Sequence, residues 1–314
     1  MSELTIRPAR LDDTAAISAL SQAHISVWQR LGSGGRVEDV PYAALTLYER
    51  WLHGGAWMSV ETGAIHLSHL LHGAGLALVA EGDGGVRAYC EGYAGSEPPP
   101  FGAHLHMMAP VVHPAAAADG LDAALLRAMA EQARALKLPR LLACAAPPEQ
   151  KAFYAAQGMR VVENVRRSAL PARSGQGFYR AVDYPDPDPA VIAGWQMPLG
   201  RLESARCQWE TLWPRTWDAL PEMRQRRTHR LRLNAAGHDA LLCVQRQLYE
   251  PRSADVYCWS PRPLTSQLIT AVRDWAHREG YRTLVMAVTD SALKVLGPEA
   301  EPDAFTLDVY ALDV

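Results

Sequence analysis

Histidine and glutamate residues on two neighbouring expected strands are the sequence's clearest candidates for proton transfer. His104, His106 and Met108 share one face of a strand, because side chains alternate in direction along it. An imidazole titrates near neutral pH, so His106 is a candidate general base, and His104 shares that property. Glu91, on the preceding expected strand, is a second candidate base. The alternative for each is an ordinary strand position that is partly exposed or salt-bridged.

A second candidate is the segment that joins the strand ending at Val112 to a helix beginning near Gly120. Backbone amides at a helix N-terminus are unpaired donors at the positive end of the helix dipole, so they can bind a pyrophosphate. Glycine lets the backbone approach such an anion closely. Asp119 is the expected N-cap and Asp122 the third residue of the helix, so both carboxylates can cap it. A self-capped helix that binds no nucleotide is therefore the alternative.

The composition is that of a globular, water-soluble protein. Of 314 residues, 48% are hydrophobic and 21% charged, and the net charge of −3 gives no general attraction to nucleic acid or membrane. No apolar run reaches the roughly 18 residues of a membrane span, and the N-terminus lacks a secretory pattern. The 5 cysteines include no CxxC pair, which indicates reduced core thiols. We therefore expect a cytoplasmic protein.

Apolar periodicity predicts that the first half is a mixed α/β domain. A Gly-Asp-Gly-Gly turn between two apolar runs indicates a hairpin, and strands joined by a long helix should be parallel. The expected order is a strand at 4–7, helices at 12–31, 42–51 and 62–71, strands at 76–81, 86–93 and 104–112, a helix at 120–136, a strand at 140–145, a helix at 149–157 and a strand at 160–165.

Three prolines within residues 184–189 predict a stiff linker between domains 1–183 and 190–314. The second half repeats the tail of the first: strand, long helix, strand, short helix, strand. This repetition suggests a duplicated fold. Its expected elements are a helix at 204–217, strands at 229–234, 240–248 and 256–260, a helix at 264–278, a strand at 283–288, a helix at 291–296 and a strand at 305–312.

The stretch 76–162 resembles the GCN5-related N-acetyltransferase (GNAT) superfamily. In that family a strand ends in Val-x-Pro, and Arg/Gln-x-x-Gly-x-Gly/Ala opens the next helix. The matching run here begins Val112-His113-Pro114 and keeps Gly120. Phe153-Tyr154-Ala155-Ala156-Gln157-Gly158 resembles a second family element, and residues 4–13 resemble the family's opening. Some members are tandem pairs with one half degenerate, as expected here.

The resemblance implies acyl transfer from acetyl-CoA or another acyl-CoA to a small amine, with no metal. Tyr154 matches the tyrosine that often protonates the departing thiolate; its alternative role is packing beside Phe153. The implied cofactor-binding residues are Val111, Val112, Ala117, Ala118, Asp119, Gly120, Leu121, Asp122, Ala123 and Phe153. Val111 and Val112 supply backbone amides in place of Pro110, which has none.

The sequence departs from the family at the pyrophosphate motif. Ala117 replaces Arg/Gln, and Asp122 replaces the second Gly/Ala. A carboxylate about 5 Å from a phosphate charge repels it by roughly 3 kcal/mol at an effective dielectric near 20. Two hypotheses follow: an N-acetyltransferase-like enzyme, or a weak or inactive member that binds a ligand or partner in the same cleft.

Three other features are weaker candidates. His66, His69 and His72 have a spacing that suggests a metal, but no Cys or carboxylate completes the set. The arginines from 224 to 232 could bind phosphates, although a charged strand edge is the commoner explanation. The tryptophans of the second half are expected in its core, and its motif position at 259–265 has no glycine. We expect no second CoA site, no nucleic-acid partner, and a monomer or homodimer.

Overall fold

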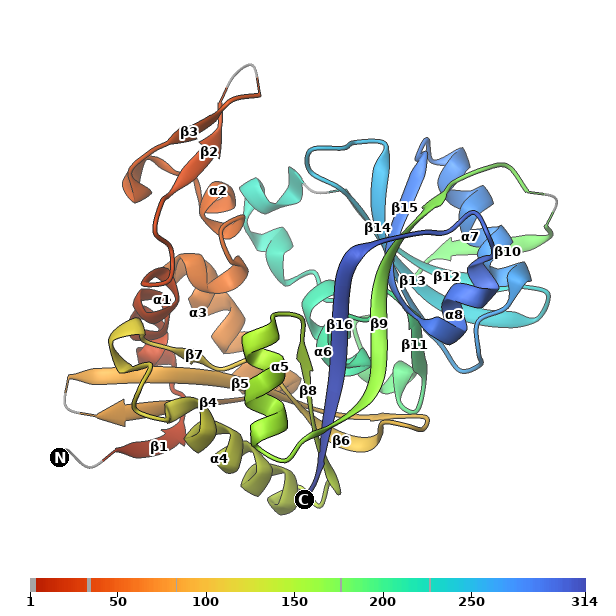
Figure 1. Ribbon diagram of the computed structural model, residues 1–314. Coiled ribbons are helices and arrows are strands. Elements are labelled where there is room, and N and C mark those ends of the chain that lie inside the picture. The colour runs from red at the N-terminus through yellow and green to blue at the C-terminus, as the bar shows by residue number, and fades with distance from the viewer. Residues whose placement is uncertain (1–3, 33–34, 83, 176, 226) are drawn as a thin grey trace. The chain divides into compact units, whose positions relative to one another are not determined.

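The structure is a computed structural model that describes residues 4–32, 35–82, 84–175, 177–225 and 227–314 (Figure 1). The chain forms two compact units that alternate along the sequence. The first unit comprises Met1–Tyr93, Met107–Leu136 and Thr216–Gln225. The second comprises Ala94–His106, Lys137–Arg215 and Arg226–Val314.

The first unit has a small antiparallel sheet. Its strands are β1 (Thr5–Pro8), β4 (Leu76–Gly82), β5 (Gly85–Glu97) and β7 (Val111–Val112). The order is β1-β4-β5, and β7 also pairs with β5. The expected hairpin of β4 and β5 is confirmed, with Val79 opposite Tyr89. Asp83 of its turn lies outside the described residues.

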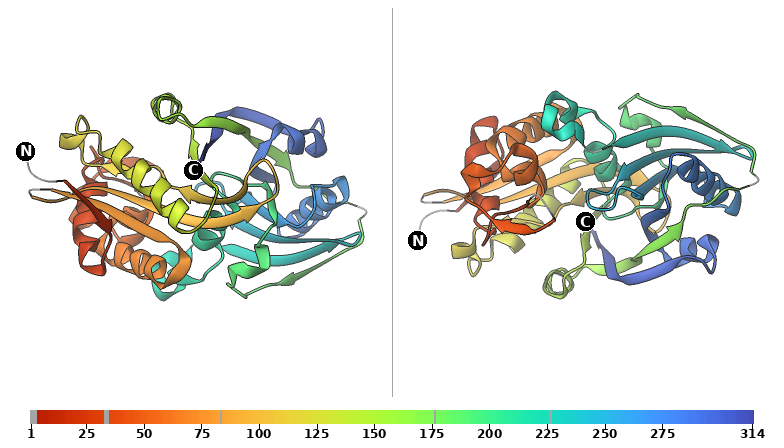
Figure 2. Two further views of the ribbon diagram at one scale, coloured as in Figure 1. Left: turned by 90° about the horizontal axis from the view of Figure 1, so that it is seen from below. Right: turned by 90° about the horizontal axis from the view of Figure 1, so that it is seen from above.

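Helices cover both faces of this sheet. Seen from opposite sides, α4 lies along one face of the strands, and α1 and α3 lie along the other (Figure 2). Ser59 caps α3 by accepting a hydrogen bond from Thr62 N at 3.2 Å. Ile17, Leu67 and Met129 are fully buried. The helices are α1 (Thr14–Gln22), α2 (Leu47–Trp51), α3 (Val60–His69) and α4 (Leu121–Ala135), with a π-helical turn at Leu70–Ala74.

Two expected elements of this unit were wrong in extent. The helix predicted to reach residue 31 ends at Gln22, and a small hairpin follows, made of β2 (Gln29–Leu31) and β3 (Val37–Asp39). Val27 and Leu31 are 46% and 47% exposed, so their helical spacing did not reflect a buried face. The strand expected at 104–112 breaks between Met107 and Val111, where Pro110 cannot donate a ladder hydrogen bond.

The second unit contains most of the mixed sheet. Its strand order is β6-β8-β16-β9-β15-β14-β13-β12-β10, and β11 pairs with β14. The strands are β6 (Gly102–Met107), β8 (Arg140–Ala145), β9 (Arg160–Pro171), β10 (Tyr179–Asp183), β11 (Gln196–Leu199), β12 (Thr228–Ala235), β13 (His238–Arg246), β14 (Ser253–Ser260), β15 (Thr283–Thr289) and β16 (Glu301–Asp313). The helices are α5 (Pro148–Ala156), α6 (Ala205–Leu212), α7 (Ser266–Arg278) and α8 (Asp290–Leu296).

The two sequence halves share this sheet. The C-terminal strand β16 lies between β8 and β9, and Tyr310 pairs with Ala143 on one side and Val161 on the other. Strand β9 in turn pairs with β15 of the second half. The parallel pair expected in the second half is confirmed, since β14 and β15 run parallel and α7 joins them. For the first half, β6 and β8 are neighbours as expected, and their direction stays a prediction.

The proline-rich segment at 184–189 lies inside the second unit and is packed against it. Tyr184 N donates to Arg230 O at 2.9 Å, and Trp209 Nε1 donates to Pro187 O at 2.8 Å. The two compact units thus have other boundaries than the proposed domains 1–183 and 190–314. That boundary concerns a duplication of the chain, and it stays a prediction.

The cores are as the composition predicted. Trp209, Trp213 and Trp259 form one buried cluster in the second unit, with Trp209 stacked on Trp213 at 4.2 Å. Trp275 packs with α7 into another, whereas Trp217 belongs to the first unit. All 5 cysteines are buried and free in the structure, which confirms their expected position in the cores. In the described residues no helix is both long enough and apolar enough to cross a membrane.

Candidate active site

The loop between β7 and α4 leads to a helix N-terminus that begins at a glycine. Strand β7 pairs with β5, where Val111 lies opposite Tyr89 and Val112 opposite Ala88. The chain then makes a short turn and reaches Gly120, which precedes the helix with a left-handed φ of 67°. A Cβ added to Gly120 would meet nothing within 4 Å, so the space around it is open. The amides of the first turn of α4 have no partners within the helix.

The expected capping of α4 was half right. The N-cap is Gly120, so Asp119 does not cap the helix, and Asp122 is its second residue. Asp122 Oδ1 nevertheless accepts a hydrogen bond from Ala123 N at 2.8 Å. One carboxylate therefore occupies an amide of the first turn, and its charge opposes an anionic ligand. Of the other predicted cofactor residues, Leu121 is buried as the first residue of α4, and Ala117 and Ala118 lie in the loop.

Glu91 lies at the centre of a buried polar cluster in the first unit. Its carboxylate accepts hydrogen bonds from Trp57 Nε1 at 2.9 Å, Tyr89 Oη at 3.1 Å and Tyr93 Oη at 2.7 Å. His66 Nε2 lies 3.1 Å from each carboxylate oxygen. Four side chains from α3, β5 and the turn before α3 thus converge on one charge.

These contacts make Glu91 a poor general base. Burial alone would raise the pKa of Glu91, but the charge of His66 and the hydrogen bonds from His66, Trp57 and Tyr93 lower it to about 2. A base works best when its pKa is near the operating pH. The structure therefore favours an organising anion that fixes His66 and three aromatic side chains, in place of the proton acceptor that the sequence suggested.

His66 is held on several sides by this cluster. The Trp57 ring meets the imidazole edge-to-face at 5.6 Å, and the Trp217 ring stacks on it at 6.4 Å. Trp217 in turn contacts Trp51 at 4.3 Å. The His66 side chain is only 12% exposed. The three-histidine metal hypothesis loses support, because His66 is committed to Glu91 and His72 Nδ1 contacts Ser68 O at 2.6 Å.

Phe153 and Tyr154 lie on α5 in the second unit. Tyr154 is 1% exposed and packs against Tyr310 of β16, with ring centroids 5.6 Å apart. Phe153 contacts Tyr154 at 5.2 Å. The packing role that the sequence left open accounts for these contacts. Because the loop at Gly120 belongs to the other unit, the joint action of Tyr154 and that loop stays a prediction.

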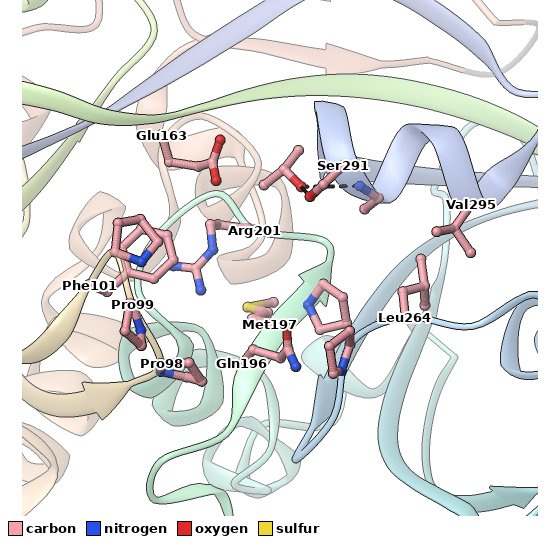
Figure 3. A pocket seen from close by; sticks show the side chains of 15 residues that line it. Pro98, Pro99, Phe101, Glu163, Gln196, Met197, Arg201, Leu264, Ser291 and Val295 are labelled. Carbon is pink, nitrogen blue, oxygen red and sulfur yellow. Dashed lines mark hydrogen bonds between the residues drawn. The ribbon is translucent and has the colours of Figure 1, made fainter.

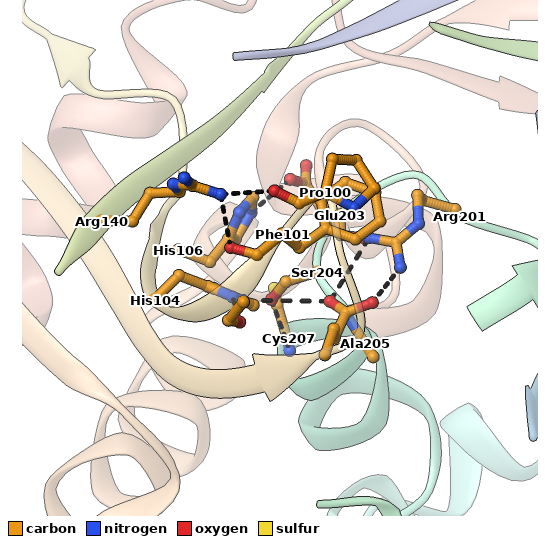
Figure 4. Close-up of polar contacts among 12 residues, drawn as sticks. Pro100, Phe101, His104, His106, Arg140, Arg201, Glu203, Ser204, Ala205 and Cys207 are labelled. Atoms are coloured by element: carbon orange, nitrogen blue, oxygen red, sulfur yellow. Dashed lines mark hydrogen bonds and ion pairs between the residues drawn. The ribbon is translucent and has the colours of Figure 1, made fainter. Parts of the chain in front are cut away.

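His104 belongs to a buried ionic cluster in the second unit. Glu97 forms an ion pair with Arg201, and its Oε1 also accepts from Ala205 N at 3.0 Å. His104 Nε2 lies 3.9 Å from Glu97, while its Nδ1 is 2.8 Å from Gly102 O (Figure 4). Burial lowers the pKa of His104 to about 4, and the Glu97 charge offsets this only in part. His104 is thus neutral near pH 7.

Arg201 keeps Glu97 ionised. Burial by itself raises the pKa of Glu97, but the Arg201 charge and hydrogen bonds hold it below its usual value. The Arg201 guanidinium also lies 4.1 Å from the centre of the Phe101 ring. Within the second unit, this cluster joins the loop after β11 to β6 and to Glu97, the last residue of β5.

His106, the other histidine candidate, is fully buried. Its Nε2 contacts Glu203 Oε2 at 2.6 Å. The Cys144 thiol of β8 also hydrogen-bonds to Glu203. The ring nitrogen Nε2 of His106 is therefore engaged with Glu203, which also binds the Cys144 thiol. The sequence did not predict either partner.

In the second half, strand β11 occupies the gap between the parallel strands β14 and β15. β14 and β15 pair only from Ser253 to Asp255, after which β11 enters the gap between them. Leu199 pairs with Cys258 of β14, and Gly200 N donates to Ala287 O at 2.7 Å on the other side. The chain's own strand thus fills the place where the ends of β14 and β15 separate.

A small pocket lies beside β11. Its volume is about 210 Å³, whereas sites for drug-sized ligands typically measure about 300–1,000 Å³. Figure 3 shows Arg201 between Phe101 and Met197, with Glu163 across the pocket. The volume of this pocket lies below that range, and the absence of a second CoA site stays a prediction.

Arginines of the basic run at 224–232 have partners inside the protein. Arg230 donates to Leu212 O at 3.1 Å, Arg232 pairs with Asp239 at 2.8 Å, and Arg227 pairs with Glu279 at 2.9 Å. Strand β12 lies between β10 and β13, so the expected charged sheet edge was wrong. Arg226 lies outside the described residues.

Sequence reasoning missed the partners that define both clusters. Tyr89, Glu91 and Tyr93 alternate along β5, and this period of two could have shown a shared polar face. Trp57 and His66 are brought to that face by tertiary packing alone. Similarly, no spacing in the sequence connects Cys144 or Glu203 with His106.

The fold assigns the chain to a class. No family model matches the sequence, and no curated protein matches it either. The structure, however, is similar to a GCN5-related N-acetyltransferase from Anabaena variabilis ATCC 29413, with a TM-score of 0.63 at 11% identity over 98% of this chain and 72% of the other. The chain therefore has the fold of the GCN5-related N-acetyltransferases.

Two further solved structures refine this assignment. A tandem GNAT protein from the clavulanic acid biosynthesis pathway has a TM-score of 0.51 at 14% identity, with 99% of this chain and 98% of that chain covered. A probable N-acyltransferase from Enterococcus faecalis V583 has a TM-score of 0.59 at 11% identity, with 99% and 73% covered. The fold is thus the tandem GNAT fold, a mixed α/β architecture.

Proposed function

We propose that the protein is an N-acetyltransferase-like enzyme that transfers an acetyl or other acyl group from acyl-CoA to a small amine. The observation that carries this proposal is the glycine-capped start of α4 directly after β7, within a GNAT fold. The space at Gly120 is open, and amides of the first turn of α4 offer donors to an anion. Acyl-CoA would bring the activated thioester, and the reaction needs no metal.

The chain's own residues would divide the remaining work. Residues 117–123 would hold the pyrophosphate, and the amides of Val111 and Val112 would orient the acyl group. Tyr154 remains the proposed acid. For the proton acceptor we propose His66 in its neutral form, in which Nε2–H donates to Glu91 and Nδ1 is the basic nitrogen. Glu91 is then a positioning residue.

A second candidate function is a weak or inactive member that binds a ligand or partner. The contact of Asp122 with Ala123 N favours it, because this carboxylate competes with a phosphate for the same amide. The second half, with β11 in its strand gap, would then be a structural partner of the first. Cytoplasmic location and a monomeric or homodimeric state are part of either proposal.

Calorimetric titration with acetyl-CoA and with coenzyme A tests the ligand. Asp122→Gly should tighten binding by about 1–3 kcal/mol, because a repulsive charge is lost. Glu131→Gln is the matched control, since it removes a negative charge from the middle of the same helix. Unchanged affinity in Asp122→Gly would show that Asp122 points away from the phosphates. No binding by any variant would contradict the acyl-CoA proposal.

A further inference from the structure

His106, Cys144 and Glu203 bring three different donor types together in the second unit. A ring nitrogen, a thiol sulfur and a carboxylate oxygen lie within 4.8 Å of one another. They come from β6, from β8 and from the loop between β11 and α6. Among the described residues this is the one group of His, Cys, Asp or Glu side chains compact enough to surround a metal ion.

Two of the three groups are buried, and the third is partly exposed. His106 is fully buried, Cys144 is 7% exposed, and the Glu203 side chain is 24% exposed. His106 Nε2 contacts Glu203, but its Nδ1 is buried and has no hydrogen-bond partner in the described part of the chain. Such an atom calls for a water molecule or an ion as its partner.

The neighbouring charges are compatible with a cation. Arg201 lies in the same loop as Glu203, and its charge is paired with that of Glu97. A thiolate and a carboxylate together carry two negative charges, which a divalent ion would balance in this low-dielectric interior.

We propose that His106, Cys144 and Glu203 form a binding site for a divalent zinc-class ion. A thiolate with an imidazole selects zinc over magnesium or calcium, which prefer oxygen ligands. Donors of a tetrahedral zinc ion lie about 3.5 Å apart, so small side-chain rotations complete the site. Three protein ligands leave the fourth position to water.

The site would link three segments that are distant in the sequence. Its existence does not depend on the acyl transfer proposed above.

Cobalt titration of the full chain, treated first with a chelator, tests the proposal. One equivalent of Co²⁺ should produce a thiolate-to-cobalt charge-transfer band, and Zn²⁺ should abolish it. Cys144→Ser should lose the band and bind more than about 100-fold more weakly, because even outer-shell partners contribute 10–100-fold. Cys258→Ser is the control, since it alters an equally buried thiol in another core.

Thermal unfolding supplies a second readout. Excess Zn²⁺ should raise the melting temperature of the wild type and of Cys258→Ser but not of Cys144→Ser. If the cysteine variants do not fold, Glu203→Gln takes their place, because that side chain is partly exposed, and it should weaken Co²⁺ binding. A folded wild type without a thiolate band, or a band that persists in Cys144→Ser or at full affinity in Glu203→Gln, would overturn the proposal.

Discussion

Replacing Glu91 with glutamine should destabilise the protein strongly at neutral pH. The carboxylate accepts hydrogen bonds from Trp57, His66, Tyr89 and Tyr93. Glutamine offers one acceptor oxygen and places an amide NH₂ where the second oxygen was. Tyrosine hydroxyls can rotate to accept from it, but Trp57 Nε1–H cannot. Buried donors that lose their acceptor cost stability.

The size of the effect follows from the ionisation of Glu91. A carboxyl whose pKa falls from 4.5 to about 2 on folding stabilises the native state by about 3 kcal/mol at pH 7. Removing one partner of a buried ion pair typically costs about 3–5 kcal/mol, a range that includes the value derived from the pKa of Glu91. We therefore expect Glu91→Gln to lower the free energy of unfolding by about 3 kcal/mol.

The dependence on pH has a definite sign. Because the folded-state pKa of Glu91 is depressed, its contribution is complete above about pH 4.5 and is lost as the pH falls toward 2. The difference in stability between wild type and Glu91→Gln should therefore shrink over this range. The other groups around this carboxylate are His66, the Tyr89 and Tyr93 hydroxyls and the neighbouring Cys90 thiol.

Urea unfolding at pH 7, 5, 4 and 3, followed by circular dichroism and tryptophan fluorescence, measures this difference. Glu81→Gln is the control in the same unit. Glu81, like Glu91, belongs to an ion pair, here with Arg7 at 2.7 Å, but its side chain is 43% exposed. An exposed pair contributes at most about 1 kcal/mol. A loss in Glu91→Gln no larger than in Glu81→Gln, or a difference that grows in acid, would refute the reasoning.

Two further predictions concern turnover in an acyl-transfer assay over a panel of amines. Tyr154→Phe keeps the ring that packs on Tyr310, so folding should survive while turnover falls about 10²–10⁴-fold; intact turnover would remove Tyr154 from the mechanism. His66→Gln keeps an N–H donor for Glu91 but lacks the basic ring nitrogen, so turnover of the folded variant should fall by a similar factor, and stability should also fall because the charge that faces Glu91 is lost. Full activity in His66→Gln would show that another group accepts the proton.

Local signals in the sequence determined most of the elements. Apolar alternation placed β4, β8 and β15, and helical spacing placed α4 and α7, because each pattern reflects one buried face of one segment. The GNAT resemblance of residues 76–162 predicted the fold that the structural comparisons show. The same local reasoning failed at residues 27–31, where helical spacing had no buried face behind it.

Only the tertiary structure decided which distant segments meet. Nothing in the sequence shows that β16 lies between β8 and β9, since strand pairing depends on the whole sheet and a strand's own pattern fits several neighbours. The same holds for the functional clusters. The sequence identified Glu91 as a candidate carboxylate, but its low pKa depends on His66 and Trp57, which packing brings to it from another segment. His106 likewise acquires its partners, Cys144 and Glu203, only through the fold.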